Sequence, residues 1–412
     1  MTSKRTIFSV GAVSLLATAV ACDQSANRIT DAAGDGSGAP QQPQRSVAAT
    51  VLRVEDVEQL YAAVNNPANE GAAITLAPGT YVLSATNAVG AGRPNGGRLE
   101  LQRDMSLCGV ANDRSAVVID ATAPTLSFNV SFGRTAPVRI GRGSNSIEWL
   151  TILGNPAAAA NIAAELTGTP RTQIRVAHVV AGGSSRGVDV RNAGPTMVGR
   201  RIDAEIVDNE FVGPTEVQGA AEGIRVTNFV GADNGVIVAT LAGNRTHGFQ
   251  VGFLAVNNKS SNAIVQVRSS GDRFFANGIG GLIFGGIRQT ATGAANSNST
   301  SVEVHGSEFV DNRASPGDLA PAGIRVAGGI GTIPNAASDN TVSVALWGSK
   351  VSDNQGVNFE AYGARMEPPS AVAGTNNHVT IELHGVSKQI DVQAAASQPV
   401  DPTGTNTVTV IR

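Results

Sequence analysis

The chain has 412 residues, of which 42% are hydrophobic, 4% are aromatic and 48 are glycine, and its formal net charge is −3. This length can bury a large core, and small apolar residues with many glycines suit a narrow core enclosed by tight turns. The balanced charge and the lack of a basic patch in the sequence exclude nucleic acid as an expected partner.

The N-terminus has the composition of a targeting segment. A basic start precedes an uncharged apolar run over 7–20, which is too short for a convincing membrane span. The sequence Ala19-Val20-Ala21-Cys22 resembles the lipobox of bacterial lipoproteins, in which the cysteine becomes the lipidated N-terminus, although leucine is more usual where Ala19 stands. We therefore predict a signal peptide over 1–21, export, and a lipid on Cys22 that anchors the protein to a membrane of the cell envelope. Ordinary secretion after the same cut is the alternative.

Residues 22–50 are rich in Gly, Ser, Ala, Pro and Gln. This composition cannot bury a core and predicts a flexible tether. A single domain is expected over 51–412. It opens with a short helix over 56–66, where Val57, Leu60, Tyr61 and Val64 make one apolar stripe. We expect this helix to cover the first turn of whatever follows it.

Short apolar segments then alternate with turns. Their spacing resembles the pectate-lyase-like superfamily of right-handed parallel β-helices, whose members often open with a capping helix, an I-x-L-x-P-G-x-Y segment and L-x-G followed by V-I-D. The matching residues are Ile74, Leu76, Pro78, Gly79 and Tyr81, then Leu107 and Gly109, then Val118, Ile119 and Asp120. The resemblance covers roughly 54–412. It implies the fold, while the superfamily includes lyases, hydrolases, epimerases and adhesins and so implies no single activity. The layout of 121–200 is not predicted.

From about residue 200 the chain repeats one pattern, aligned on a glycine that follows an alternating run. The aligned glycines are Gly243, Gly271, Gly306, Gly348 and Gly385. Two, four and six positions before each glycine the residues are mostly apolar, with Ser269 and Thr300 as exceptions. Asn277, Asn312 and Asn354 also share one position, and asparagines stacked at turns can bond to one another.

Alternation without helical periodicity indicates half-buried strands, and a unit that recurs every few dozen residues indicates a solenoid. The predicted fold class is therefore all-β: a right-handed single-stranded parallel β-helix with a short N-terminal capping α-helix. A β-sandwich of similar strands is the alternative.

The same register separates outward from inward residues and so ranks candidate site residues. One column reads His305, Trp347, His384, and the neighbouring outward column holds Glu303 and Glu382. A sugar that stacks on Trp347 beside these carboxylates and imidazoles would use this face for binding. The two glutamates would lie about 9.5 Å apart at the backbone, two coils apart, which is the upper end of the range for inverting glycosidases.

A second outward column is predicted to hold Arg225, Leu254, Ile283, Arg325 and Glu360, with Arg325 and Glu360 able to pair. Lyases of the superfamily use an Arg or Lys as Brønsted base beside a calcium-bound acidic cluster. The arginine is present as Arg325, but the acidic cluster and the G-G-x-G-x-D calcium repeat are not evident. Hence no metal site and no cofactor are predicted, with calcium left as a possibility lacking a clear site.

Cys108 is the only cysteine besides Cys22. If Cys22 is acylated, Cys108 has no partner and is expected to be a small buried apolar residue. The sequence therefore predicts an exported, non-catalytic β-helix rod that binds a glycan or serves a structural role. The alternative is a polysaccharide lyase or glycoside hydrolase, with Glu303, Glu382 and Arg325 as weak catalytic candidates and Trp347, His305 and His384 as binding residues.

Overall fold

The structure is a computed structural model of the whole chain. It describes residues 50–123, 136–165, 171–193, 198–214, 221–288, 295–314, 320–331, 337–366, 374–386, 392–398 and 405–412. The predicted signal peptide, the predicted tether and Cys22 lie outside these residues. In the described part of the chain, no helix is both long and apolar enough to cross a membrane.

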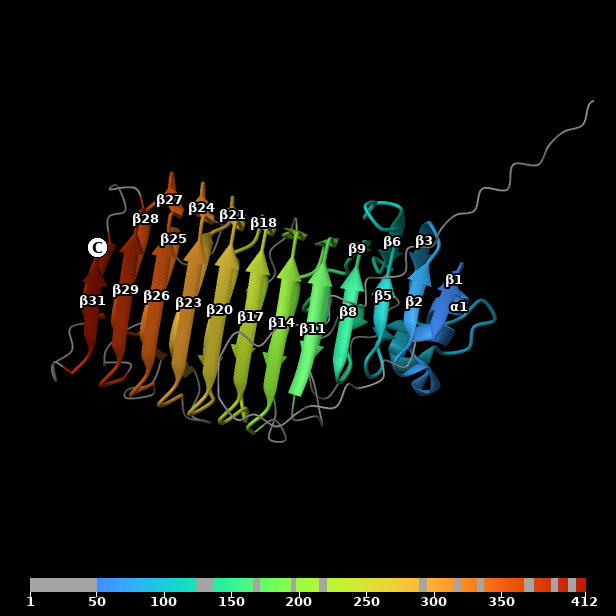
Figure 1. Cartoon of the computed structure of the whole chain (residues 1–412), viewed down its shortest axis with the longest axis horizontal. Helices are drawn as coiled ribbons and strands as arrows, with labels where there is room; N and C mark the ends of the chain where they lie inside the picture. Colours follow the sequence, from blue (N-terminus) through green and yellow to red (C-terminus); the bar gives the residue numbers. More distant parts are fainter. Residues whose placement is uncertain are drawn as a thin grey trace, which may run out of the picture.

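The chain folds as a right-handed parallel β-helix. Three sheets, in which every pairing of named strands is parallel, run side by side along the rod, and successive coils of the chain contribute a strand to each sheet in turn (Figure 1). The β-sandwich alternative is therefore wrong, because sandwich sheets are antiparallel.

The first sheet has 12 strands and carries the alternating runs that the sequence revealed. Its strands, in spatial order, are β1 (Val51–Val54), β2 (Ala73–Leu76), β5 (Ser106–Cys108), β8 (Ser144–Glu148), β11 (Arg171–Ala177), β14 (Arg201–Val207), β17 (Val236–Ala242), β20 (Ile264–Ser270), β23 (Ser299–His305), β26 (Thr341–Trp347), β29 (His378–His384) and β31 (Thr407–Ile411).

The second sheet has 9 strands, most of them three residues long. They are β3 (Gly79–Val82), β6 (Val117–Asp120), β9 (Thr151–Leu153), β12 (Val180–Gly182), β15 (Glu210–Val212), β18 (Arg245–His247), β21 (Arg273–Phe275), β24 (Glu308–Val310) and β27 (Lys350–Ser352). The sequence predicted only a polar turn here. The central residues, such as Phe274 and Phe309, are buried in the core.

The third sheet has 10 strands. They are β4 (Leu99–Glu100), β7 (Val138–Arg139), β10 (Ile162–Glu165), β13 (Arg186–Asn192), β16 (Glu222–Asn228), β19 (Val251–Asn258), β22 (Ile279–Arg288), β25 (Ala322–Gly331), β28 (Val357–Met366) and β30 (Val392–Gln398). Its strands are buried on both faces; in β16, for example, every residue is buried.

The predicted register of the 12-stranded sheet is confirmed. Ser269, Val304, Leu346 and Leu383 pair in succession on adjacent strands, and each is at most 5% exposed. The aligned glycines follow these strands with φ between 56° and 66°. That left-handed conformation suits glycine, because glycine lacks the Cβ that makes it costly.

Asparagines, most of them buried, bond from coil to coil at several corners of the rod. Asn312 Nδ2 donates to Asn354 Oδ1 at 2.7 Å, and Asn277 N–H donates to Asn312 Oδ1 at 3.1 Å, as the sequence predicted. Further side-chain ladders, which the sequence did not reveal, join Asn192, Asn228 and Asn257; Asn209 and Asn244; and Asn298, Asn340, Asn377 and Asn406. These bonds satisfy polar groups that the stacked coils remove from water.

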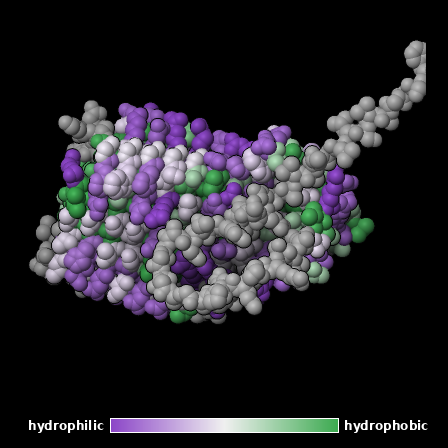
Figure 2. Space-filling model, viewed as in Figure 1, coloured by the Kyte–Doolittle hydropathy of each residue, from purple (hydrophilic) through white to green (hydrophobic). Residues whose placement is uncertain are grey.

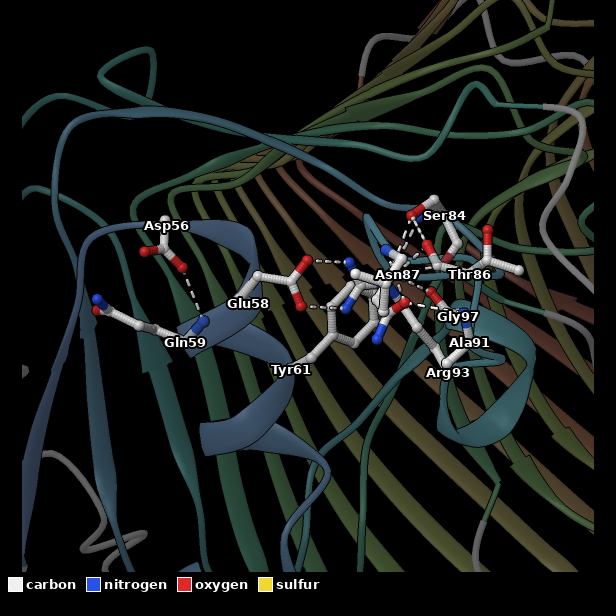
Figure 3. Close-up of polar contacts among 11 residues, drawn as sticks. Asp56, Glu58, Gln59, Tyr61, Ser84, Thr86, Asn87, Ala91, Arg93 and Gly97 are labelled. Atoms are coloured by element: carbon white, nitrogen blue, oxygen red, sulfur yellow. Dashed lines mark hydrogen bonds and ion pairs between the residues drawn. The ribbon is translucent and has the colours of Figure 1, made fainter.

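The predicted capping helix is α1 (Val57–Val64), followed by the short 3-10 helices η2 (Pro67–Asn69) and η3 (Pro94–Gly97). The Asp56 side chain accepts from Gln59 N–H, and Leu60 and Val64 are fully buried against the first coils. Figure 3 shows how the helix is tied down: Arg93 pairs with Glu58 at 2.8 Å and its guanidinium carbon lies 4.1 Å from the Tyr61 ring centroid. The Tyr61 hydroxyl donates to Gly97 O at 2.6 Å. The helix thus closes the N-terminal end of the core.

Candidate functional site

Three predicted site residues lie together at one edge of the 12-stranded sheet. His305, Trp347 and His384 end strands β23, β26 and β29 and pair in register on neighbouring coils. Trp347 is 43% exposed, among the few large hydrophobic side chains that face solvent. Figure 2 shows mixed hydrophilic and near-neutral residues on the described part of this face toward the C-terminal coils.

The three rings form a column parallel to the rod axis. The Trp347 and His384 rings lie 3.7 Å apart at an interplanar angle of 14°, so one face of the indole is covered. The His305 and Trp347 centroids are 6.0 Å apart at 7°, so the other face is only partly covered. The site therefore offers ring edges and one partly covered indole face, rather than the open stacking platform that the sequence predicted.

Glu303 and Glu382 lie in the neighbouring column, separated by Ala345 on the strand between them. Glu303 Oε2 pairs with Arg268 Nε at 3.1 Å, and Glu382 Oε2 lies 3.2 Å from His384 Nε2. The glutamate side chains are 42% and 36% exposed. Two carboxylates held by their own neighbours on an open sheet face can accept hydrogen bonds from ligand hydroxyls, but such a face does not exclude water from a reacting bond.

Arg325 is not part of this face. It lies on β25 in the 10-stranded sheet, is 1% exposed, and forms an ion pair with Glu360 on the next coil, as its position predicted. Glu360 also accepts from the Tyr362 hydroxyl at 2.7 Å. Burial, reinforced by that bond, raises the pKa of Tyr362 to about 12. A guanidinium enclosed in this way is not positioned as a base for a ligand on the outer face of another sheet.

The predicted column through Arg325 contains one error. The structure pairs Arg325 with Leu282, not Ile283. A shift of one residue exchanges the two faces of a strand. The corner before β25 has more residues than the corner before β22, so alignment by counting from the asparagine is unreliable there.

The ion pairs of a second group of charged residues were not predicted from the sequence. Arg186 on β13 pairs with Glu222 on β16, and Arg225 Nε lies 3.7 Å from Asp189 Oδ1. Each of these four side chains is at most 6% exposed, and burial is the main cause that lowers the pKa of Arg225. The signal in the sequence was the alternation of charged and small residues over 186–191, which marks a strand with a polar outer face.

His178, which is isolated in the sequence, has an aromatic partner. Its ring stacks on Trp149 at 3.8 Å and 12°. Burial lowers the pKa of His178, with a smaller opposing effect of Asp208. The pair lies at the same edge of the 12-stranded sheet as Trp347.

Cys108 departs from the sequence-based expectation. It is buried, at 3% exposure, as predicted, but it is disulfide-bonded rather than a partnerless thiol. The sequence contains two cysteines, and the other, Cys22, lies outside the described residues. Across the described residues, no group of three or more His, Cys, Asp and Glu side chains is placed to hold a metal ion.

No protein-family profile and no curated protein sequence matches this chain. Among solved structures, it is similar to the A-module of the mannuronan C-5 epimerase AlgE4 from Azotobacter vinelandii, with 15% identity, a TM-score of 0.44, and 87% of this chain and 97% of that chain covered. It is also similar to the AlgE6 A-module of the same organism, with 14% identity, a TM-score of 0.29, and 86% and 93% covered. Likeness at this level carries no inference about the activity of this chain.

Proposed function

We propose that this chain is an exported β-helix rod that binds a glycan, without turning it over, through the outward face of its last coils. Trp347 carries the proposal, because an indole that is 43% exposed and held between two imidazoles can contact the apolar face of a sugar ring. Glu303, Glu382 and the histidine ring nitrogens supply hydrogen-bonding groups beside it. In fold the chain resembles the pectate-lyase-like proteins, but its candidate carboxylates are held by neighbours on an open face.

Replacement of Trp347 by alanine tests this proposal. The protein is screened against neutral and acidic polysaccharides by affinity electrophoresis, and binding is then measured by calorimetry for wild type and Trp347→Ala. We expect a loss of affinity of about 5- to 150-fold, because an aromatic contact at a binding face contributes about 1–3 kcal/mol. Leu153→Ala is the matched control, since Leu153 is also 43% exposed but lies on another sheet.

The same reactions are followed for reducing ends and for the absorbance of unsaturated products. The proposal predicts that no reducing ends and no unsaturated products are formed. Turnover that is lost in Glu303→Gln or Glu382→Gln would establish the enzymatic alternative instead. A protein that binds none of the polysaccharides would leave the structural role of the rod as the explanation.

Export has two alternative consequences for Cys22. A lipid on Cys22, supported by the sequence Ala19-Val20-Ala21-Cys22, would tether the rod to a membrane through residues 22–50. A disulfide is supported by the bonded state of Cys108. The two consequences exclude one another within one chain, because the sequence offers Cys108 no other cysteine.

Mass spectrometry of the mature protein separates these alternatives. A diacylglyceryl adduct on the peptide that begins at Cys22, and membrane partitioning that is lost in Cys22→Ser, are the results that the lipid anchor predicts. A peptide pair joining Cys22 and Cys108, released by reduction, would contradict the lipid anchor and establish secretion without it.

A further inference from the structure

Both tryptophans of the chain lie at one edge of the rod. Trp347 ends β26, and Trp149 directly follows β8, in each case where the 12-stranded sheet gives way to the 9-stranded sheet. In Figure 1 this is the edge at which the arrowheads of β8 and β26 end. Six strand spacings separate β8 from β26, which places the two positions ~29 Å apart along the axis.

Each tryptophan is stacked on a histidine from the following coil. Trp149 and His178 lie 3.8 Å apart at 12°, and Trp347 and His384 lie 3.7 Å apart at 14°. The same pair of residue types thus occurs twice, in the same order and at nearly the same geometry. Trp149 and His178 are each partly exposed.

Both residues of the pair at the N-terminal end have a left-handed backbone conformation. Trp149 has φ of 58° and His178 has φ of 56°, whereas the equivalent positions of the next coils hold Asp208 and Gly243, which suit that conformation. A bulky residue there costs on the order of 1–3 kcal/mol. Since Gly, Asp or Asn would complete the turn without this cost, the turn alone does not explain the tryptophan at this position.

The charged residues around each of the two pairs carry a net negative charge. Near Trp149, Arg175 pairs with Glu148 and Glu205, and Arg114 pairs with Glu210. Near Trp347, Arg268 pairs with Glu303, and Glu382 lies beside His384. A polyuronate would meet net repulsion at both ends of this edge, so the charge favours an uncharged ligand.

We infer that the two Trp–His pairs are subsites of one extended surface, along which a linear neutral glycan lies parallel to the rod axis. This inference rests on the proposed function and adds the direction, the length and the charge class of the ligand. A polymer that reaches both subsites gains from the high effective concentration of the second contact once the first is made, whereas an oligomer shorter than the separation makes only one contact.

The test uses xylan, hydroxyethyl cellulose and soluble β-1,3-glucan, each with its own di- to tetrasaccharides, on the full-length protein. Affinity is measured for wild type, Trp149→Asn, His178→Asn and Trp347→Ala. Asparagine suits the backbone at 149 and 178, so these two variants remove a ring and keep the turn. Thermal melts followed by circular dichroism check that each variant is folded.

For wild type, we expect a polymer to bind about a hundredfold more tightly than its short oligomers. Trp149→Asn and His178→Asn should abolish this difference, because the polymer can then make only the contact at Trp347. Trp347→Ala should weaken the binding of polymers and of short oligomers. Leu153→Ala should leave the affinity for polymers and for short oligomers unchanged.

Two results would overturn the inference. One is polymer affinity that is unchanged in folded Trp149→Asn and His178→Asn, and the other is tighter binding of polygalacturonate than of every neutral polymer. Either result leaves the proposed function standing if Trp347→Ala still weakens binding of short oligomers. If no probe binds wild type, the proposed function fails, and this inference fails with it.

Discussion

Single residues that break the repeat explain much of the chemistry inside the rod. Ser269 and Thr300 interrupt the apolar inward column, and both are buried. Thr300 Oγ1 donates to Phe284 O and accepts from Asn257 Nδ2, so it continues an asparagine ladder. Ser269 Oγ donates to Asp272 Oδ2 at 2.6 Å. A polar residue at an otherwise apolar position of the repeat here marks a side chain that is hydrogen-bonded to a buried polar group.

Asp272 is the acidic member of a ladder otherwise built from amides and hydroxyls. Its Oδ1 accepts from the backbone and side-chain amides of Asn244, both at 2.8 Å, and its N–H donates to Ser307 Oγ. Burial raises the pKa of Asp272 from 3.8 to about 6, although its hydrogen bonds act in the opposite direction. The folded protein thus holds this proton more tightly than the unfolded chain does.

The free energy of unfolding should therefore fall with rising pH because of Asp272. Its contribution is fully present below about pH 4 and is lost as the pH rises through about 6, a change of about 3 kcal/mol. Asp272→Asn removes the titration and also supplies an amide like that of Asn244. We expect it to raise the free energy of unfolding at pH 8, measured by urea denaturation, and to give no gain at pH 4.

Asp208→Asn is the control for this experiment, because Asp208 has a 55% exposed side chain and a backbone conformation that asparagine accepts. This substitution should leave the free energy of unfolding almost unchanged at pH 4 and at pH 8. Equal effects of Asp272→Asn at pH 4 and pH 8 would show that Asp272 does not titrate differently in the folded state.

At the scale of the element, the side-chain ladders join coils that would otherwise meet only through strand hydrogen bonds and apolar packing. Asn340 Oδ1 accepts from the N–H and the Nδ2 of Asn298, and Asn340 Nδ2 donates to Asn377 Oδ1 at 3.0 Å. All three asparagines are buried. Removal of one member therefore leaves donors that no water reaches.

Asn340→Ala should lower the free energy of unfolding by about 3 kcal/mol, because two buried donors of Asn298 lose their acceptor. Ser299→Ala, on the exposed face of β23, should stay within about 0.5 kcal/mol of wild type. Chemical denaturation of the three proteins side by side measures both values. A loss below about 1 kcal/mol for Asn340→Ala would mean that the ladder is dispensable.

The elements differ in how far the sequence could predict them. In the 12-stranded sheet, the strands from β14 to β29 alternate over seven residues and are followed by a glycine or another left-handed residue, so their register was readable. The strands of the 9-stranded sheet are too short to show a period. The 10-stranded sheet is buried on both faces, so its strands show no alternation of polar and apolar residues. For this reason the sequence placed Ile283, and not Leu282, in the column of Arg325.

At the scale of the whole molecule, the rod has an N-terminal end that a helix closes and one outward edge that carries both tryptophans. The repeat predicted the column of His305, Trp347 and His384, because its members recur at one position. It could not predict the stack of Trp149 on His178, because those coils lack the marker glycine and the register of 121–200 was unreadable. Nor could it predict that the rings of His305, Trp347 and His384 would stack on one another.

The central claim is that Trp347 contacts a glycan. In Trp149→Asn, Trp347 is the only tryptophan left in the chain, so its fluorescence reports on that site alone. Titration with the short oligosaccharide that binds wild type should give a saturable change in Trp347 emission, with a midpoint equal to the dissociation constant measured by calorimetry. Binding by calorimetry without any change in that emission would contradict the account.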